Sequence, residues 1–276
     1  MPTTTQIKKK TVPAPNSAKT VKSAKPTKPA PARMTLAQAM TALEKAGSAQ
    51  TRKTYLRHGA IEPMFGVSFA TLKTMVKQIG VDQELALALW NTGNHDARTL
   101  AVKIADPLRM TTSDLDRWAK VQSGRMCGAY VGYLASEGPH ARSRSDAWLA
   151  APDEPRRCCG WQLVGALAMC DEDTPDTWFG EHLAKIEKSI QSAPNMERAS
   201  MLTALIAIGC RSAALRKSVT AAAKRLGKIE IDQGDTDCKT PEVVPTLEKT
   251  WTYAASKGFA SPAAQERARE PMRTRC

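Results

Sequence analysis

The stretch LWNTGNHDARTLAVKI, residues 89–104, contains two short apolar helical faces separated by one polar turn. Leu100 and Ile104 mark the face after the turn, because residues four apart lie on the same side of an α-helix. Gly93 can end the first helix in a left-handed conformation, and Asn94 can cap the second. The stretch therefore predicts two helices joined by a tight turn.

Similar helix signals recur every ten to twenty residues on both sides of this stretch. Thr35 and Ser68 are candidate N-caps, and Ser113 followed by Asp116 resembles a capping box. Further helices are expected at 36–46, 69–79, 114–121, 156–169, 177–190, 197–208, 213–226 and 243–257. The only strand candidate is KIEID, residues 228–232. About a dozen helices joined by brief turns predict an all-α curved solenoid of HEAT-like antiparallel helix pairs, an α-α superhelix. A compact, irregular helical bundle is the alternative.

The charge of the chain is concentrated at its N-terminal end. The formal net charge is +13, and residues 1–33 hold eight basic residues and no acid. Their Lys, Ala, Pro, Thr and Ser composition predicts a disordered basic tail, which either adds non-specific nucleic-acid contacts or only improves solubility. We expect a helical repeat domain at 34–258 and a flexible C-terminal tail at 259–276. A basic balance of this kind favours a polyanionic partner.

The cysteines and acidic residues do not form a recognisable metal motif. The seven cysteines lack the paired spacing of a zinc site or a disulfide framework, which favours a reducing compartment. Asp232, Asp235 and Asp237 lie in a turn-rich stretch without the glycine and terminal glutamate of an EF-hand, so we interpret them as turn-capping residues. We expect no metal and no cofactor. Without an apolar span or signal core, a cytoplasmic monomer without membrane contact is expected.

Four segments in order resemble the bacterial DNA alkylation repair family, the helical-repeat alkylpurine DNA glycosylases. They are residues 65–107, which carry an F-G-V turn, an L-W helix end and an H-D-x-R-x-L-A helix; LDRWAKVQ, 115–122; EPRRCCGWQLVGAL, 154–167; and GKIEIDQGDTDCKTPEVVP, 227–245. The resemblance covers roughly 50–250 and implies a curved helical stack whose concave face holds duplex DNA. It also implies that residues 89–104 form the junction within one helix pair.

The resemblance implies a catalytic position that this chain fills only in part. Family members place a tryptophan and a carboxylate four residues apart, to stabilise the cationic base and the oxocarbenium-like sugar. Trp118 matches the tryptophan, but the carboxylate position holds Gln122, and no aromatic residue occurs at Met201 to Ala204, where a second tryptophan is expected. Asp114, four residues before Trp118, is the candidate substitute. The alternative is that Asp114 only complements the helix dipole and Trp118 is a core residue.

Arg156 and Arg157 match the helix-opening arginine pair that contacts the DNA backbone in the family. Two guanidiniums at a helix N-terminus oppose the helix dipole, and a bound phosphate relieves that conflict. The alternative is a local salt bridge to Asp153 or Glu154.

The sequence supports two function hypotheses. The first is a protein that binds alkylated or distorted double-stranded DNA, with retention of N-glycosylase activity on cationic alkylpurines left open. The second is a non-catalytic helical-repeat scaffold that binds a protein partner.

Overall fold

The computed structural model describes residue 3 and residues 33–121 and 124–275. The chain divides into two units, residues 1–32 and 33–276, and the description below concerns the second unit. The predicted basic tail, apart from Thr3 and Arg33, lies outside the described residues.

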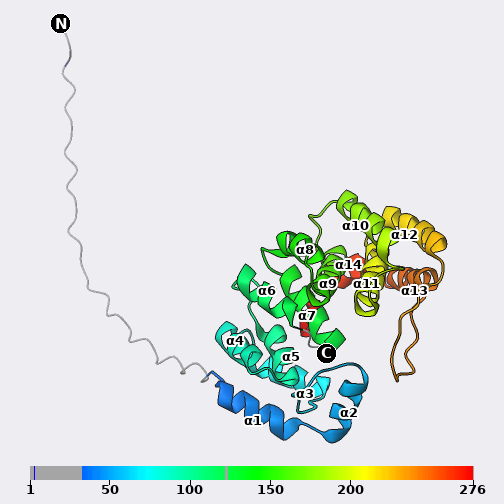
Figure 1. Ribbon diagram of the computed structural model, residues 1–276. Coiled ribbons are helices and arrows are strands. Elements are labelled where there is room, and N and C mark those ends of the chain that lie inside the picture. The colour runs from blue at the N-terminus through cyan, green and yellow to red at the C-terminus, as the bar shows by residue number, and fades with distance from the viewer. Residues whose placement is uncertain (1–2, 4–32, 122–123, 276) are drawn as a thin grey trace. The chain divides into compact units, whose positions relative to one another are not determined.

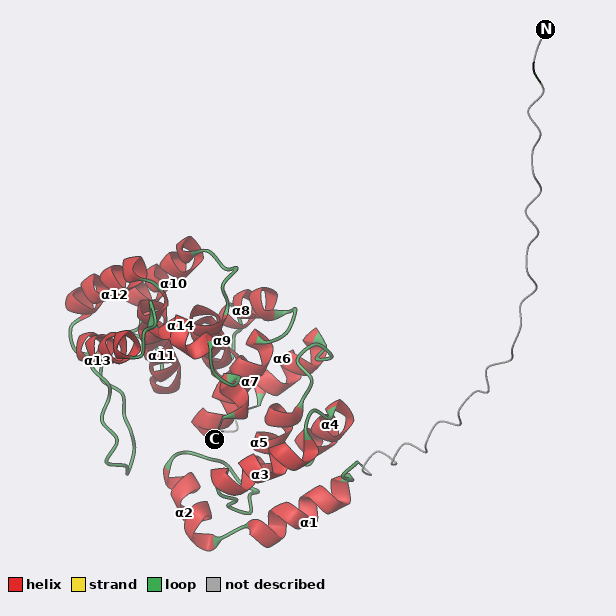
Figure 2. Cartoon of the chain, turned by 180° about the vertical axis from the view of Figure 1, so that it is seen from behind, coloured by secondary structure: helices red, strands yellow, loops and turns green. Residues whose placement is uncertain are grey.

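The described part of the second unit is helical (Figure 2). Its first seven helices are α1 (Leu36–Ala46), α2 (Ala49–Arg57), α3 (Phe69–Ile79), α4 (Gln83–Asn91), α5 (His95–Ile104), α6 (Thr112–Lys120) and α7 (Gly124–Ser136). The others are α8 (Ala141–Leu149), α9 (Glu154–Cys170), α10 (Asp176–Ser189), α11 (Asn195–Arg211), α12 (Ala213–Leu226), α13 (Val243–Ser256), α14 (Pro262–Arg267) and the 3₁₀ turn η1 (Met272–Thr274). Residues 33–121 and 124–275 contain no strand, and KIEID belongs to the irregular segment between α12 and α13. None of the described helices has the length and apolar content needed to cross a membrane.

The helices pair along the chain, and the pairs stack in chain order (Figure 1). Helix α4 packs on α5, α6 on α7, and α8 on α9. We call α5, α7, α9 and α11 the central row, because each of them packs on the next. The central row supplies much of the buried apolar core, including Leu100, Leu134, Leu163 and Leu205. The prediction of an all-α stack of helix pairs is confirmed.

The junction between α4 and α5 forms as its sequence predicts. Gly93 has a positive φ of 76°, which is the left-handed conformation that glycine adopts without strain. The side chain of Asn94 then accepts hydrogen bonds from the backbone N–H groups of Asp96 and Ala97 at 3.0 and 3.1 Å. The turn therefore caps α5 and allows it to fold back on α4.

Asp96, in the first turn of α5, connects this helix to the beginning of the unit. Its fully buried carboxylate accepts three backbone hydrogen bonds, from Phe65 at 2.7 Å and from Gly66 and Val67 at 3.0 Å each. Gly66 has a positive φ of 78°, and a Cβ there would lie 2.5 Å from the carbonyl oxygen of Ser48. The F-G-V turn therefore needs both this glycine and this carboxylate, and it fixes α2 and α3 relative to α5.

The C-terminal segment, residues 259–275, differs from the flexible tail that the sequence predicts. Helix α14 packs on α9, α11 and α13, and η1 packs on α5 and α7, so the segment lies along the central row (Figure 1). The ammonium of Lys103 is buried and donates to the carbonyl oxygens of Arg273 and Arg275, both at 2.8 Å. The buried Arg273 also pairs with Glu137 at 2.7 Å. Since both cations look like surface residues in the sequence, these contacts could not be foreseen.

We expect Asp96→Ala to destabilise the protein strongly, because it leaves three backbone N–H groups without their acceptor. Each unsatisfied buried donor costs about 1–3 kcal/mol, so the free energy of unfolding is expected to fall by roughly 3–9 kcal/mol. Urea denaturation measures this change. Asp96→Asn keeps one acceptor oxygen and should cost less, whereas Glu230→Gln, at an exposed ion pair, should have no measurable effect. An Asp96→Ala variant as stable as the wild type contradicts this role.

Candidate nucleic-acid interface

Trp118 lies in the core of the stack. Its side chain is fully buried, and its ring stacks on that of Trp90 with the centroids 4.2 Å apart and the planes 6° apart. The guanidinium of Arg98 lies 5.3 Å from the centroid of the Trp90 ring. No described residue accepts a hydrogen bond from the indole N–H of Trp118. Trp118 therefore exposes no surface to a ligand in this conformation, and its role as an aromatic wall stays a prediction.

The two acids near Trp118 are engaged in local contacts. Helix α6 begins two residues earlier than its capping signal suggests, with Thr111 and not Ser113 as the N-cap, and the Thr111 hydroxyl donates to Asp114 at 2.7 Å. Asp114 also accepts from Arg117 at 2.8 Å. Asp116 accepts from Arg144 and from the indole N–H of Trp148 instead of forming a capping box. Gln122 lies outside the described residues.

Arg156 and Arg157 stand together at the start of α9 but have different partners. Arg156 pairs with Asp153, whose carboxylate raises the pKa of the guanidinium by hydrogen bonding. Arg157 reaches Glu197 on α11 at 2.8 Å and also donates to the carbonyl oxygens of Ala151 and Pro152. Arg156 thus forms the local salt bridge that was the alternative interpretation, whereas the α11 partner of Arg157 was not anticipated. A phosphate contact by either residue stays a prediction.

Two of the described thiols are poorly reactive. Burial raises the pKa of both Cys158 and Cys210 to about 12, so their reactive thiolate forms are scarce at neutral pH. The described residues contain no group of three or more histidine, cysteine, aspartate or glutamate side chains placed to hold a metal ion. In the acidic stretch before α13, Asp232 accepts from the backbone N–H of Gly234 at 2.8 Å, which fits its interpretation as a turn residue.

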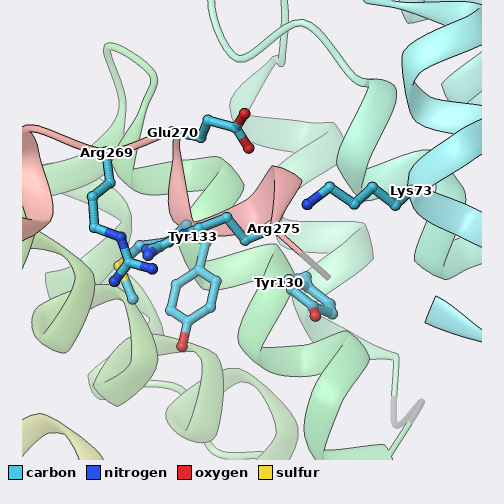
Figure 3. Close-up of a pocket in the computed structure, with 7 residues that line it drawn as sticks. Lys73, Tyr130, Tyr133, Arg269, Glu270 and Arg275 are labelled. Atoms are coloured by element: carbon cyan, nitrogen blue, oxygen red, sulfur yellow. The ribbon is translucent and has the colours of Figure 1, made fainter. Parts of the chain in front are cut away.

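Two hollows in the described surface are lined by unequal numbers of cations and acids. The first has a volume of about 640 Å³ and lies between α3, α7 and the C-terminal segment (Figure 3). Its lining residues are Lys73, Tyr130, Tyr133, Arg269, Glu270, Met272 and Arg275. The second has a volume of about 510 Å³ and lies between α12 and α13. Its charged lining residues are Arg216, Lys217, Lys224 and Glu248. Each hollow therefore has three cations and one acid, a balance that suits anionic ligands.

Neither hollow was predicted from the sequence. The first depends on the C-terminal segment, which no local pattern places against α3 and α7. The second had one signal, because α12 carries four basic residues and no acid over 213–226. On an amphipathic helix such a pattern is also typical of an ordinary solvent-exposed face. Sequence alone therefore does not separate such a face from a surface that binds an anionic ligand.

Comparison with known proteins finds one matching family and two similar proteins. Residues 38–228 match the family described as DNA alkylation repair enzyme. Uncharacterized proteins of Listeria innocua serovar 6a and Listeria monocytogenes serovar 1/2a are each 23% identical to this chain over 222 residues, which cover 78% of this chain and 97% of each relative.

One solved structure has the same fold, with a TM-score of 0.73 and 28% sequence identity over 82% of this chain and 96% of its own. That protein is described as part of a new family related to the HEAT-like repeat DNA glycosylases with affinity for branched DNA structures. The predicted HEAT-like class of the fold is thereby confirmed.

We expect Arg157→Ala to reduce stability more than Arg156→Ala. The first change leaves Glu197 nearly buried without its cation and should cost roughly 2–3 kcal/mol, less than a fully buried pair because Arg157 is 23% exposed. The second removes a half-buried pair between residues three apart in sequence, each 27% exposed, and should cost less, about 1 kcal/mol. Thermal and urea unfolding of both variants check this order. Equal, small losses would show that Arg157 is free to serve mainly a ligand.

Proposed function

Because the chain belongs to the DNA alkylation repair enzyme family, we propose that it binds DNA through the phosphate backbone and prefers branched or distorted structures over plain duplex. The affinity for branched DNA described for its structural relative supports the choice of ligand. The basic segment 1–33 adds contacts that do not depend on sequence. The protein acts as a monomer in this proposal.

The observation that carries the proposal is the pair of cationic hollows. Lys73 and Lys77 lie one turn apart on α3, and neither takes part in an ion pair with another described residue. Lys217 and Lys224 lie two turns apart on α12, and neither of them takes part in an ion pair with another described residue. Such lysines lose little by exchanging water for a phosphate and release bound counterions from DNA when they do.

Base excision is not part of the proposed activity, although family membership alone would suggest it. A glycosylase of this kind needs a carboxylate and an aromatic surface at the cationic nucleotide. Asp114 is shared between Thr111 and Arg117, and the Trp118 ring is covered by protein. The family's carboxylate position holds an amide, that of Gln122, which cannot offset positive charge.

The full chain is expected to bind a three-way DNA junction more tightly than a duplex of equal length, with affinity that falls as salt rises. Each phosphate contact contributes about −0.9 to the slope of log K against log salt. Fluorescence anisotropy between about 50 and 200 mM salt measures this slope. Lys217→Gln with Lys224→Gln should make it shallower by up to about 2, and removal of residues 1–33 should act in the same direction.

Lys185→Gln with Lys188→Gln is the matched control, because these lysines lie on α10 outside both hollows. A slope near zero for the wild type, or an equal change in test and control variants, contradicts a phosphate interface. Absence of binding to any DNA would favour the protein-scaffold hypothesis.

We expect the wild type to release N7-methylguanine and N3-methyladenine from methylated duplex only slowly. Gln122→Asp returns a carboxylate four residues from Trp118 and should raise release by about tenfold or more, on the scale of such electrostatic contacts. Chromatography of released bases measures the rate. Efficient release by the wild type that Asp114→Asn abolishes would overturn this view and assign the catalytic charge to Asp114.

A further inference from the structure

The first hollow has an aromatic floor supplied by α7. Tyr130 and Tyr133 lie one turn apart, with ring centroids 6.0 Å apart and planes 79° apart. Tyr130 is buried and has the Lys103 ammonium 3.9 Å from its ring centroid. Both tyrosines line the hollow, but Tyr133 is only half-buried, so its ring offers the larger surface to a ligand (Figure 3). Burial raises the pKa of Tyr133, which keeps its hydroxyl protonated and neutral.

The wall opposite α3 is the C-terminal segment, and buried contacts hold it in place. Lys103 binds the carbonyl oxygens on both sides of Thr274, and Arg273 binds Glu137 just beyond the end of α7. Because these anchors are buried, the wall has a fixed distance from the tyrosines. The hollow is therefore a formed site and not a gap beside a loose chain end.

The rim of the hollow combines one cation that has no ion-pair partner among the described residues with two cations that ion pairs hold in place. Lys73 extends from α3 toward the C-terminal segment (Figure 3) and has no acidic partner among the described ion pairs. Arg269 and Arg275 both pair with Glu266. A guanidinium has five N–H donors, so one carboxylate leaves donors available for a phosphate oxygen.

We propose that this hollow receives an unpaired nucleotide of a DNA strand, with its base against Tyr133 and its phosphate between Lys73 and the arginines of the C-terminal segment. A volume of about 640 Å³ suits a ligand of nucleotide size. A ring with cations beside it is the combination that binds single-stranded nucleic acid. The proposal rests on the proposed function and explains its preference, because branch points and distortions expose unpaired nucleotides.

The test uses the full chain and a three-way junction with 2-aminopurine at an unpaired position, together with a fully paired duplex. Stacking on Tyr133 should quench the fluorescence of the wild-type complex. Tyr133→Leu should abolish this quenching and weaken junction binding by roughly 5- to 150-fold, as expected for the loss of one stacked base, with duplex affinity unchanged. Tyr133→Phe keeps the ring and should keep the quenching. Lys73→Gln should weaken junction binding by a smaller factor.

Tyr253→Leu and Lys185→Gln are the matched controls, since one removes an exposed tyrosine on α13 and the other an exposed lysine on α10. Circular dichroism and melting confirm that each variant is folded. Unchanged quenching in Tyr133→Leu, or an equal loss of duplex and junction affinity, overturns the nucleotide site. Salt-dependent DNA binding without quenching in the wild type would also overturn it while leaving the proposed function standing. No binding to either DNA would remove both.

Discussion

The carboxylate of Asp96, which accepts three backbone hydrogen bonds, holds the first third of the described unit together. A buried carboxylate without a cation beside it is costly unless hydrogen bonds replace its water, and the N–H groups of 65–67 do so. The N-terminus of α5 adds a favourable dipole. Through this contact the F-G-V turn orients α3, and α3 places Lys73 at the rim of the tyrosine hollow.

Local signals were sufficient to predict the helices and most of their ends. Thr35, Ser68 and Asn94 cap the helices that they were expected to cap, because capping depends on residues within one turn. The resemblance to the family identified the F-G-V turn and the H-D-x-R helix as two motifs of one segment, residues 65–107. Their physical connection could not be predicted, because a carboxylate in the first turn of a helix is usually explained by the helix dipole alone. Only the folded chain shows that Asp96 reaches residues about thirty positions away.

The candidate site was less predictable than the fold, because charges in sequence carry no information about their partners. Arg157 was expected to meet a phosphate or a nearby acid, and its ion pair with Glu197, forty residues further on, had no signal in the sequence. Trp118 was matched by motif, yet its stacking on Trp90 in the core depends on how α4 and α6 pack. The tyrosines of α7 carried no signal at all, since an aromatic pair on a central helix is typical of a core. The tyrosines line a hollow because the C-terminal segment packs beside them and forms its other wall.

The attachment of η1 to α5 also affects how the domain is assembled. Lys103 and its carbonyl partners are separated by about 170 residues, so the contact closes a loop that includes α6 to α14. Contacts of such long range form late, after the local helix pairs are in place. These contacts supply Lys103 with two carbonyl acceptors and Glu137 with a guanidinium. A chain shortened before Arg273 would lose all of these contacts, so the stability of the central row depends on a segment that lies about 170 residues away from Lys103 in the sequence.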